Sequence, residues 1–301
     1  MAYFSNTKKI ICENSHGYKL EFGYSFPFFL DSYSGIHNYD GNVSTLKSAF
    51  GIGTSYIGTS VNQRDITLVI AFKDGESLIT NKQKIYNIFP LKDKGTLYYY
   101  EGYIERKINY YVEKVTLTRK ANYIYATINL LCPSPYFMDS EETIATLSNW
   151  DKLFKFKLEI PDTGIMFGQK NEASTIEIVN DSHISYGLTI TFIANDTVKN
   201  PKLINNATGE TLQLNYTMNL NDCIIITTYD NDKTITLIES DGTETDITNS
   251  LVFGTKFLQA QNGVNKFNAS ADSGTEDLDV SISYYNYYEA VWLNENYWKR
   301  Y

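Results

Sequence analysis

The sequence predicts a mainly β protein with an N-terminal α+β domain, a β-sandwich or barrel with one helix, followed by a C-terminal β-sandwich. Three observations support this fold class. Aromatic residues that favour strands are abundant, with 25 Tyr and 16 Phe against only 6 Pro. Short alternating segments separated by turn residues recur along the chain. A helical pattern occurs once, in the first half, and does not return.

The first third of the chain is expected to contain three strands and one long loop. Two strands are predicted around Lys8–Cys12 and Tyr18–Phe22, joined by a turn at Asn14–Gly17. Residues 31–63 are rich in Gly, Ser and Asn and are expected to be a loop, with "GIGTSYIGTSVNQ" as its most flexible part. Arg64–Phe72 is predicted to be a strand whose continuous apolar centre indicates burial on both faces.

One helix and a strand meander complete the N-terminal domain. The helix is expected over Asn81–Phe89, because Ile85, Ile88 and Phe89 share one face and Pro90 then stops it. The segments "GTLYYYEGYIE", "INYYVEKVTLTRK" and "NYIYATINLLCP" then predict three strands with short connections.

A change of pattern marks the domain boundary. After "LLCPSPYF" the chain supplies around ten short strands, separated by turn signals at roughly the 8–12 residue spacing of sandwiches. We therefore predict domains at 1–135 and 136–301. Pro133 and Pro135 are expected to stiffen this joint, since each restricts the residue before it.

Bulk properties limit the classes of function. The net charge of −9 opposes non-specific binding to phosphate backbones or anionic lipid. No stretch has the length of a signal peptide core or a membrane helix, so we expect synthesis in the cytoplasm and no membrane insertion. Cys12, Cys132 and Cys223 are widely spaced, which indicates small buried residues rather than disulfides or a metal site.

No constellation of catalytic or metal-ligating residues is found. His16, His37 and His183 form no metal-spaced pair, and Cys12 and His16 are expected to straddle a turn. The glycines of residues 51–58 have the spacing of neither a nucleophile elbow nor a phosphate loop. Asp230 begins a segment that favours a hairpin turn over a calcium loop, because Ile235 stands where that loop needs Gly. We predict no catalytic residue, no cofactor and no metal.

The aromatic tail "YYNYYEAVWLNENYWKRY" leaves two functions open. Alternating aromatic residues in a strand are typical of a core on one face and a protein partner on the other. They could also stack on sugar rings, which would make the second half a carbohydrate-binding module for attachment to a host cell wall. An enzyme acting on wall polysaccharide is a third hypothesis, but it lacks a catalytic constellation.

The order of these segments resembles the distal tail proteins of long-tailed bacteriophages. The N-terminal half passes through "NQRDITLVIAF" and the helix "NKQKIYNIFPLK" and closes on "LLCPSPYF". The C-terminal half carries "FLQAQNGVNKFNASA", an aromatic-Leu pair before Gly-x-Asn, and a last aromatic strand, "VSISYYNYYEAVW". The resemblance spans nearly the whole chain.

This resemblance implies a structural protein of the virion tail tip. Six N-terminal domains would form a ring around a channel that DNA crosses without specific binding. The C-terminal domains would be galectin-like sandwiches, although the sugar-binding residues of true galectins have no counterpart here. Implied partners are the tail tube protein, a tail-tip protein and a receptor-binding protein.

Contacts between ring subunits are expected from two segments and the strand between them. These are the polar, glycine-rich loop Gly51–Gly58 and the helix Asn81–Phe89. The interface residues predicted on this basis are Tyr56, Ile57, Arg64, Lys84, Tyr86 and Asn87.

Overall fold

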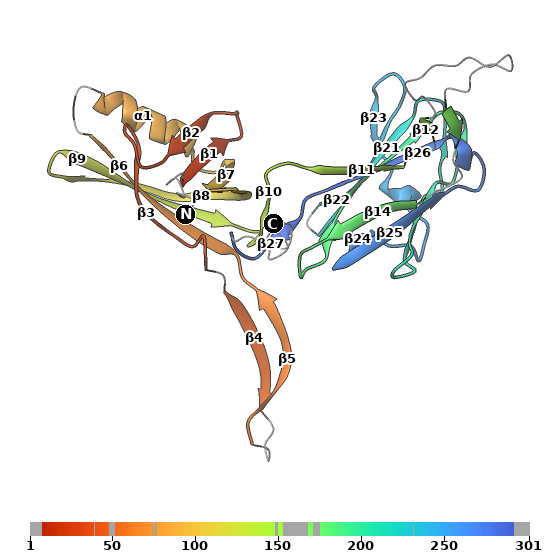
Figure 1. The fold of residues 1–301 in the computed structure, drawn as a ribbon, viewed down its shortest axis with the longest axis horizontal. Coiled ribbons are helices and arrows are strands. Elements are labelled where there is room, and N and C mark those ends of the chain that lie inside the picture. Colours follow the sequence, from red (N-terminus) through yellow and green to blue (C-terminus); the bar gives the residue numbers. More distant parts are fainter. Residues whose placement is uncertain are drawn as a thin grey trace, which may run out of the picture. The chain divides into compact units, whose positions relative to one another are not determined.

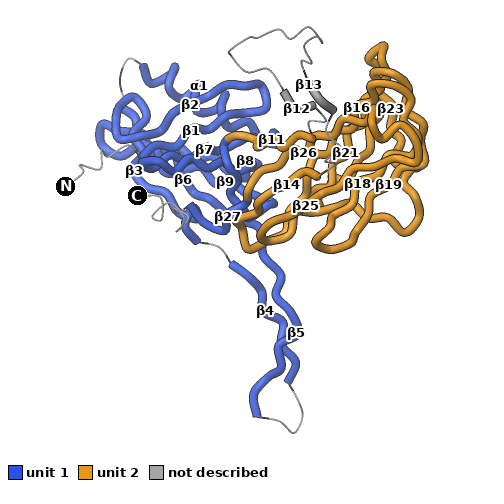
Figure 2. The backbone as a smooth tube through the Cα atoms, turned by 45° about the vertical axis from the view of Figure 1, so that its right-hand side comes forward, with its two compact units in different colours: residues 1–140, 287–301 blue, residues 141–286 orange. Residues whose placement is uncertain are grey.

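The computed structural model describes residues 8–38, 40–47, 52–73, 75, 77–147, 150–152, 168–170, 175–230 and 232–291. The chain forms two compact units (Figures 1 and 2). Unit 1 comprises Met1–Ser140 and Tyr287–Tyr301, and unit 2 comprises Glu141–Asn286. The mainly β fold class predicted from the sequence is confirmed, with one α-helix among the described residues.

Unit 1 is built on an antiparallel sheet in the order β2-β1-β7-β8-β9-β6-β3. The strands are β1 (Lys9–Asn14), β2 (Lys19–Phe22), β3 (Phe29–Ser34), β6 (Arg64–Lys73), β7 (Lys94–Glu101), β8 (Ile104–Lys120) and β9 (Tyr123–Cys132). Burial alternates strictly along β1 and β9, so one face of each strand enters the core. The predicted strands of the first half are therefore present, and β3 is an additional one.

The helix α1 (Leu78–Ile88) covers the core face of this sheet (Figure 1). It begins three residues before the predicted start, and Ile85, Ile88 and Phe89 are buried as the spacing predicted. The ring of Phe89 stacks on Phe22 of β2 at 6.0 Å between centroids. β6 is buried mainly on one face, not on both, because an antiparallel sheet can leave its second face in contact with water.

The prediction of a loop over residues 31–63 is wrong. Besides β3, this region contains β4 (Gly41–Lys47) and β5 (Thr54–Val61), which pair as an antiparallel hairpin. The hairpin, here called the arm, projects away from the sheet of unit 1 (Figures 1 and 2). Gly51, where the predicted flexible stretch begins, lies outside the described residues. The arm was missed because nearly all its side chains are exposed, so it has no apolar period.

Unit 2 contains two larger sheets that form the predicted sandwich. One has the order β11-β26-β16-β21-β22-β23 and the other β14-β25-β18-β19. Their strands are β11 (Thr143–Leu147), β14 (Thr175–Asn180), β16 (Thr189–Ala194), β18 (Lys202–Asn205), β19 (Thr211–Gln213), β21 (Cys223–Tyr229), β22 (Asp232–Ile238), β23 (Glu244–Asp246), β25 (Gly263–Ser270) and β26 (Leu278–Tyr284). β21 and β22 form the hairpin expected after Asp230.

Shorter elements complete unit 2. Three two-stranded pairs are β12 (Trp150–Lys152) with β13 (Gly168–Lys170), β15 (Tyr186–Gly187) with β24 (Gln259–Ala260), and β17 (Val198–Lys199) with β20 (Thr217–Met218). Two 3-10 helices lie at Thr248–Ser250 and Thr275–Asp277. Of the three cysteines, Cys12 and Cys132 are buried as expected, whereas Cys223 is half-buried because it lies on the outer face of β21.

The chain enters and leaves unit 2 through two paired strands of unit 1. β10 (Phe137–Asp139) pairs with β8 and with β27 (Tyr287–Tyr288). The predicted boundary at 135/136 therefore lies inside unit 1, and the division falls after Ser140 and again before Tyr287. Pro133 and Pro135 precede β10, so they lie within unit 1 and not at the division between the units.

Candidate assembly surface

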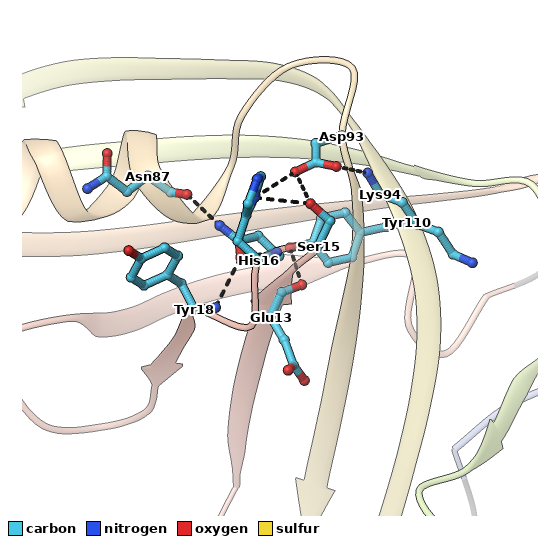
Figure 3. A network of polar contacts seen from close by, with 9 residues as sticks. Glu13, Ser15, His16, Tyr18, Asn87, Asp93, Lys94 and Tyr110 are labelled. Carbon is cyan, nitrogen blue, oxygen red and sulfur yellow. Dashed lines mark hydrogen bonds and ion pairs between the residues drawn. The ribbon is translucent and has the colours of Figure 1, made fainter. Parts of the chain in front are cut away.

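A cluster of Ser15, His16 and Asp93 was the strongest candidate for catalysis among the described residues (Figure 3). Ser15 Oγ lies 3.1 Å from His16 Nδ1, Asp93 Oδ2 lies 3.6 Å from the same nitrogen, and Ser15 also donates to Asp93. In a catalytic triad the two ring nitrogens contact different partners. Here both partners meet Nδ1, so no proton can pass from serine across the ring, and the histidine is 72% exposed.

The neighbouring Asn14 stabilises the turn that carries this cluster and joins it to the helix. The buried Asn14 accepts hydrogen bonds from the amides of His16 and Tyr18, each at 3.0 Å. Its side-chain nitrogen donates to the carbonyl of Asn87 at 2.8 Å, near the end of α1 (Figure 3). Among the described residues, no three His, Cys, Asp or Glu side chains gather where they could hold a metal ion. Nor is any described helix long and apolar enough to cross a membrane.

The arm presents a group of exposed apolar side chains on a hairpin that packs no buried face. Five of its large apolar side chains are between 46% and 67% exposed: Val43, Leu46, Tyr56, Ile57 and Val61. Lys47 is the only charged residue in β4 and β5. A two-stranded hairpin alone is marginally stable in water, and a contiguous exposed apolar surface indicates a site of protein contact. These properties make the arm the candidate functional element.

A β-bulge changes the direction of the arm halfway along. Ser44 pairs with Gly58 and Thr45 with Tyr56, so Ile57 is an extra residue with no partner across the ladder. Bulges bend a strand and re-aim its side chains. The hydroxyl of Tyr56 lies 3.0 Å from Thr59 Oγ1, which ties the tyrosine to its own strand.

Arg64 fixes the root of the arm. Its Nη1 donates to the carbonyls of Gly35, Ile36 and Asn38 at 2.8–2.9 Å, in the segment that leads from β3 into β4. Its Nε donates to Pro135 O at 2.6 Å and its Nη2 to Glu289 O. One guanidinium therefore joins the arm to the segments that flank β10 and β27.

The prediction that Arg64 contacts a neighbouring subunit is wrong for its side chain. The residue is 3% exposed, and its donors are used within unit 1, with the Phe137 ring 5.0 Å from its Cζ. A buried guanidinium requires acceptors for its donors, and here backbone carbonyls supply them. Arg64 positions the arm rather than forming its contact surface.

Gly35 permits the close chain crossing at this root. Its φ is +84°, and a Cβ on it would lie 1.9 Å from the carbonyl oxygen of Asp65. Only glycine fits such an approach at a positive φ. The ring of His37, two residues on, lies edge-on to Tyr99 at 5.9 Å between centroids. The root is therefore a packed structure and not a free hinge.

The remaining predicted interface residues occupy two separate surfaces of unit 1. Tyr56 and Ile57 lie on the arm, whereas Lys84, Tyr86 and Asn87 are exposed on α1, on the other side of the sheet (Figures 1 and 2). Their exposure is compatible with subunit contact, and that role stays a prediction. Val43, Leu46 and Val61 were missed, because the arm has no apolar period that would mark it as a strand pair.

The described part of the aromatic tail is used inside the units. Tyr284 is buried and stacks on Tyr186 within unit 2. Tyr288 lies 3.9 Å from the guanidinium carbon of Arg106 within unit 1. Residues 292–301, the last part of this predicted tail, lie outside the described residues.

Comparisons with known proteins identify the fold. Residues 15–132 match the family model of the phage tail protein RIFT-related domain. A search of curated protein sequences gave no match. The structure is similar to the phage SPP1 Dit protein, described as a paradigm of the hub adsorption apparatus in phages that infect Gram-positive hosts. In that comparison the TM-score is 0.65, the identity 12%, and the coverage 93% of this chain and 99% of the other.

Two further similar chains come from the baseplate of phage P2 in its activated conformation. The structure with calcium gives a TM-score of 0.59 at 14% identity, covering 95% of this chain and 100% of the other. The structure with strontium gives 0.55 at 14% identity, covering 92% and 98%. At identities this low, the structural similarity shows the fold alone. The family model matches residues 15–132. Residues 15–132 therefore match the phage tail RIFT-related domain, and the chain has the fold of the SPP1 Dit protein.

Proposed function

We propose that the protein is a distal tail hub in which six copies form a ring between the tail tube and the tail tip. Unit 1 forms the ring, and its arm makes the contact between adjacent copies. The observation that carries this proposal is the arm itself: a two-stranded hairpin with five exposed apolar side chains and a rigid root.

Ring symmetry and charge support the same arrangement. Cyclic rings use a head-to-tail interface, in which one surface of a copy contacts a different surface of the next. A projecting element on unit 1 suits such an interface. The net charge of −9 is suited to a central channel through which DNA passes without binding.

Unit 2 is proposed to carry the receptor-binding components. It is a sandwich whose chain enters and leaves through the paired strands β10 and β27. The tail tube protein, a tail-tip protein and a receptor-binding protein are the proposed partners. The role is structural and non-enzymatic, so a zymogram on host cell wall should show no clearing. The alternative of a carbohydrate-binding module predicts glycan-array binding by the chain, for which Tyr284 and Tyr288 are poorly placed because they pack internally.

Mass measurement of the full chain tests the proposal. Light scattering and negative-stain images should show a ring of six copies, alone or with the tail tube protein. Ile57→Ser should abolish it, while Phe253→Ser, a change at a fully exposed apolar residue of unit 2, should not. A chain that stays monomeric at high concentration with its tube partner would contradict the ring, and an intact ring with Ile57→Ser would contradict the role of the arm.

A further inference from the structure

We propose that an exposed aromatic patch at the far end of β6 is the surface that receives the arm of the next copy. The patch consists of Tyr24, Phe26, Phe29, Tyr123 and Lys73. This inference rests on the proposed function, because it names the surface that the arm contacts in the ring.

The segment between β2 and β3 holds the patch outward. It is closed by hydrogen bonds from the amide of Leu30 to Gly23 O at 2.7 Å and from the amide of Gly23 to Phe28 O at 3.4 Å. Phe28 is buried, with its ring 6.0 Å from Phe72 in the core. Because Phe28 anchors the segment, Tyr24 and Phe26 are left 49% and 50% exposed.

The aromatic rings of the patch support one another. Phe26 stacks on Tyr123 of β9 at 6.0 Å and lies 6.2 Å from Phe29, which also contacts Tyr24 at 6.1 Å. The ammonium group of Lys73 lies 5.1 Å from the Phe26 centroid. The rings are therefore ordered before any partner binds, which lowers the entropic cost of association. Tyr and Phe clusters of this kind are enriched in the centres of protein interfaces.

The patch and the arm lie at opposite ends of one strand. β6 begins at Arg64, which holds the root of the arm, and ends at Lys73, which contacts the patch. Ten residues of strand separate the two features by roughly 30 Å. A head-to-tail ring requires two different surfaces on each copy, facing opposite neighbours. The two ends of β6 supply such a pair.

The chemistry of the two surfaces is also complementary. The arm offers aliphatic and tyrosine side chains with Lys47 as its single charge, so it can cover the aromatic rings while Lys73 keeps its contact with the Phe26 ring. The exposed face of α1 is a poorer receiver. Its apolar residues Ile79 and Tyr86 are interspersed with Lys82 and Lys84, which would lose hydration on contact.

Two full-length variants, studied alone and mixed, test this assignment. Phe26→Ser removes the centre of the patch and keeps the arm, whereas Ile57→Ser does the reverse. Each alone should be monomeric at concentrations where the wild type forms rings. In a mixture, the arm of the first can bind the patch of the second, and assembly should stop at a dimer because the remaining two surfaces are both defective.

Control variants distinguish a failure of the patch from a failure of the ring. Tyr103→Ser, at an exposed turn outside the patch, should assemble like the wild type. Tyr24→Ser changes a second patch residue and should weaken assembly at least tenfold. It replaces Phe26→Ser in the test if that variant loses its native circular dichroism. Normal rings from both patch variants, with Ile57→Ser monomeric, would overturn the patch and leave the hub standing. Folded variants that form no dimer when mixed would also overturn the patch. A wild type that stays monomeric at high concentration with its tube partner would remove the hub proposal instead.

Discussion

Replacing Arg64 by methionine should release the root of the arm and loosen the strands that lead to unit 2. Methionine keeps most of the side-chain volume but leaves five backbone carbonyls without their donor. Hydrogen bonds from a charged donor each contribute about 1.5–3 kcal/mol. Relief of the buried charge offsets part of this loss. We expect unit 1 to lose about 3–5 kcal/mol, because several buried carbonyls are left unsatisfied at about 1–3 kcal/mol each.

Hydrogen exchange of the full chain measures this loss of stability at individual amides near Arg64. The amide of Asn62 donates to Asp40 O at 3.0 Å and closes the ladder at the base of the arm. Exchange there should accelerate by about 100-fold to a few thousand-fold, since each 1.4 kcal/mol corresponds to a factor of ten. Exchange in β10 and β27 should accelerate as well, because the Arg64 contacts flank both strands. Arg119→Met, at an exposed arginine, is the matched control.

If the amides at the arm root and in β10 and β27 of Arg64→Met exchange within about twofold of wild type, Arg64 does not fix the root of the arm. Arg64→Lys refines the test. Its ammonium group has three donors, so at least two of the five carbonyls lose their partner. In Arg64→Lys, the amide of Asn62 should exchange at a rate between those of the wild type and of Arg64→Met.

Three further outcomes follow from single sites. Gly35→Ala should lower the melting temperature of unit 1 far more than Gly17→Ala: both have positive φ, but only at Gly35 would the new Cβ meet backbone. Equal decreases in melting temperature would show that the backbone at the Gly35 crossing can move apart to accept a Cβ. Asn265→Ala should destabilise unit 2 by about 2–4 kcal/mol, because this buried side chain hydrogen-bonds three neighbouring backbone groups. Asn268→Ala, at a half-exposed residue of the same strand, should cost under about 1 kcal/mol in urea titrations. Burial raises the pKa of the Cys132 thiol to about 12, so at pH 8 it should resist alkylation until denaturant is added, and rapid modification of the native chain would contradict its burial.

Strands with one face in the core could be predicted from the sequence. β9 alternates between buried and half-exposed residues along its whole length, and a periodic apolar pattern records such burial directly. The arm left no such record, because β4 and β5 have no buried face and their Thr, Ser and Gly content is typical of loops. An element without a buried face cannot be found by a search for an apolar period.

Arg64 and the unit boundary were misjudged for a related reason. The partners of Arg64 are backbone carbonyls up to 225 positions away, and backbone groups carry no sequence signature. β27 is two residues long and joins unit 1 by pairing with β10, a contact between distant segments. Pro133 and Pro135 gave a clear local signal, but the boundary depends on that distant pairing and so lies beyond them.

The pairing of Phe137 with Tyr288 has a mechanical and an evolutionary consequence. A force applied to unit 2 acts on β10 and β27 together, so separating the units requires both strands to detach from unit 1. Because β10 and β27 are paired, the two ends of unit 2 lie side by side. Another domain with neighbouring termini can therefore replace unit 2 without displacing β8. A chain in which a short linker joins Asp139 to Tyr287 should therefore retain the folded unit 1.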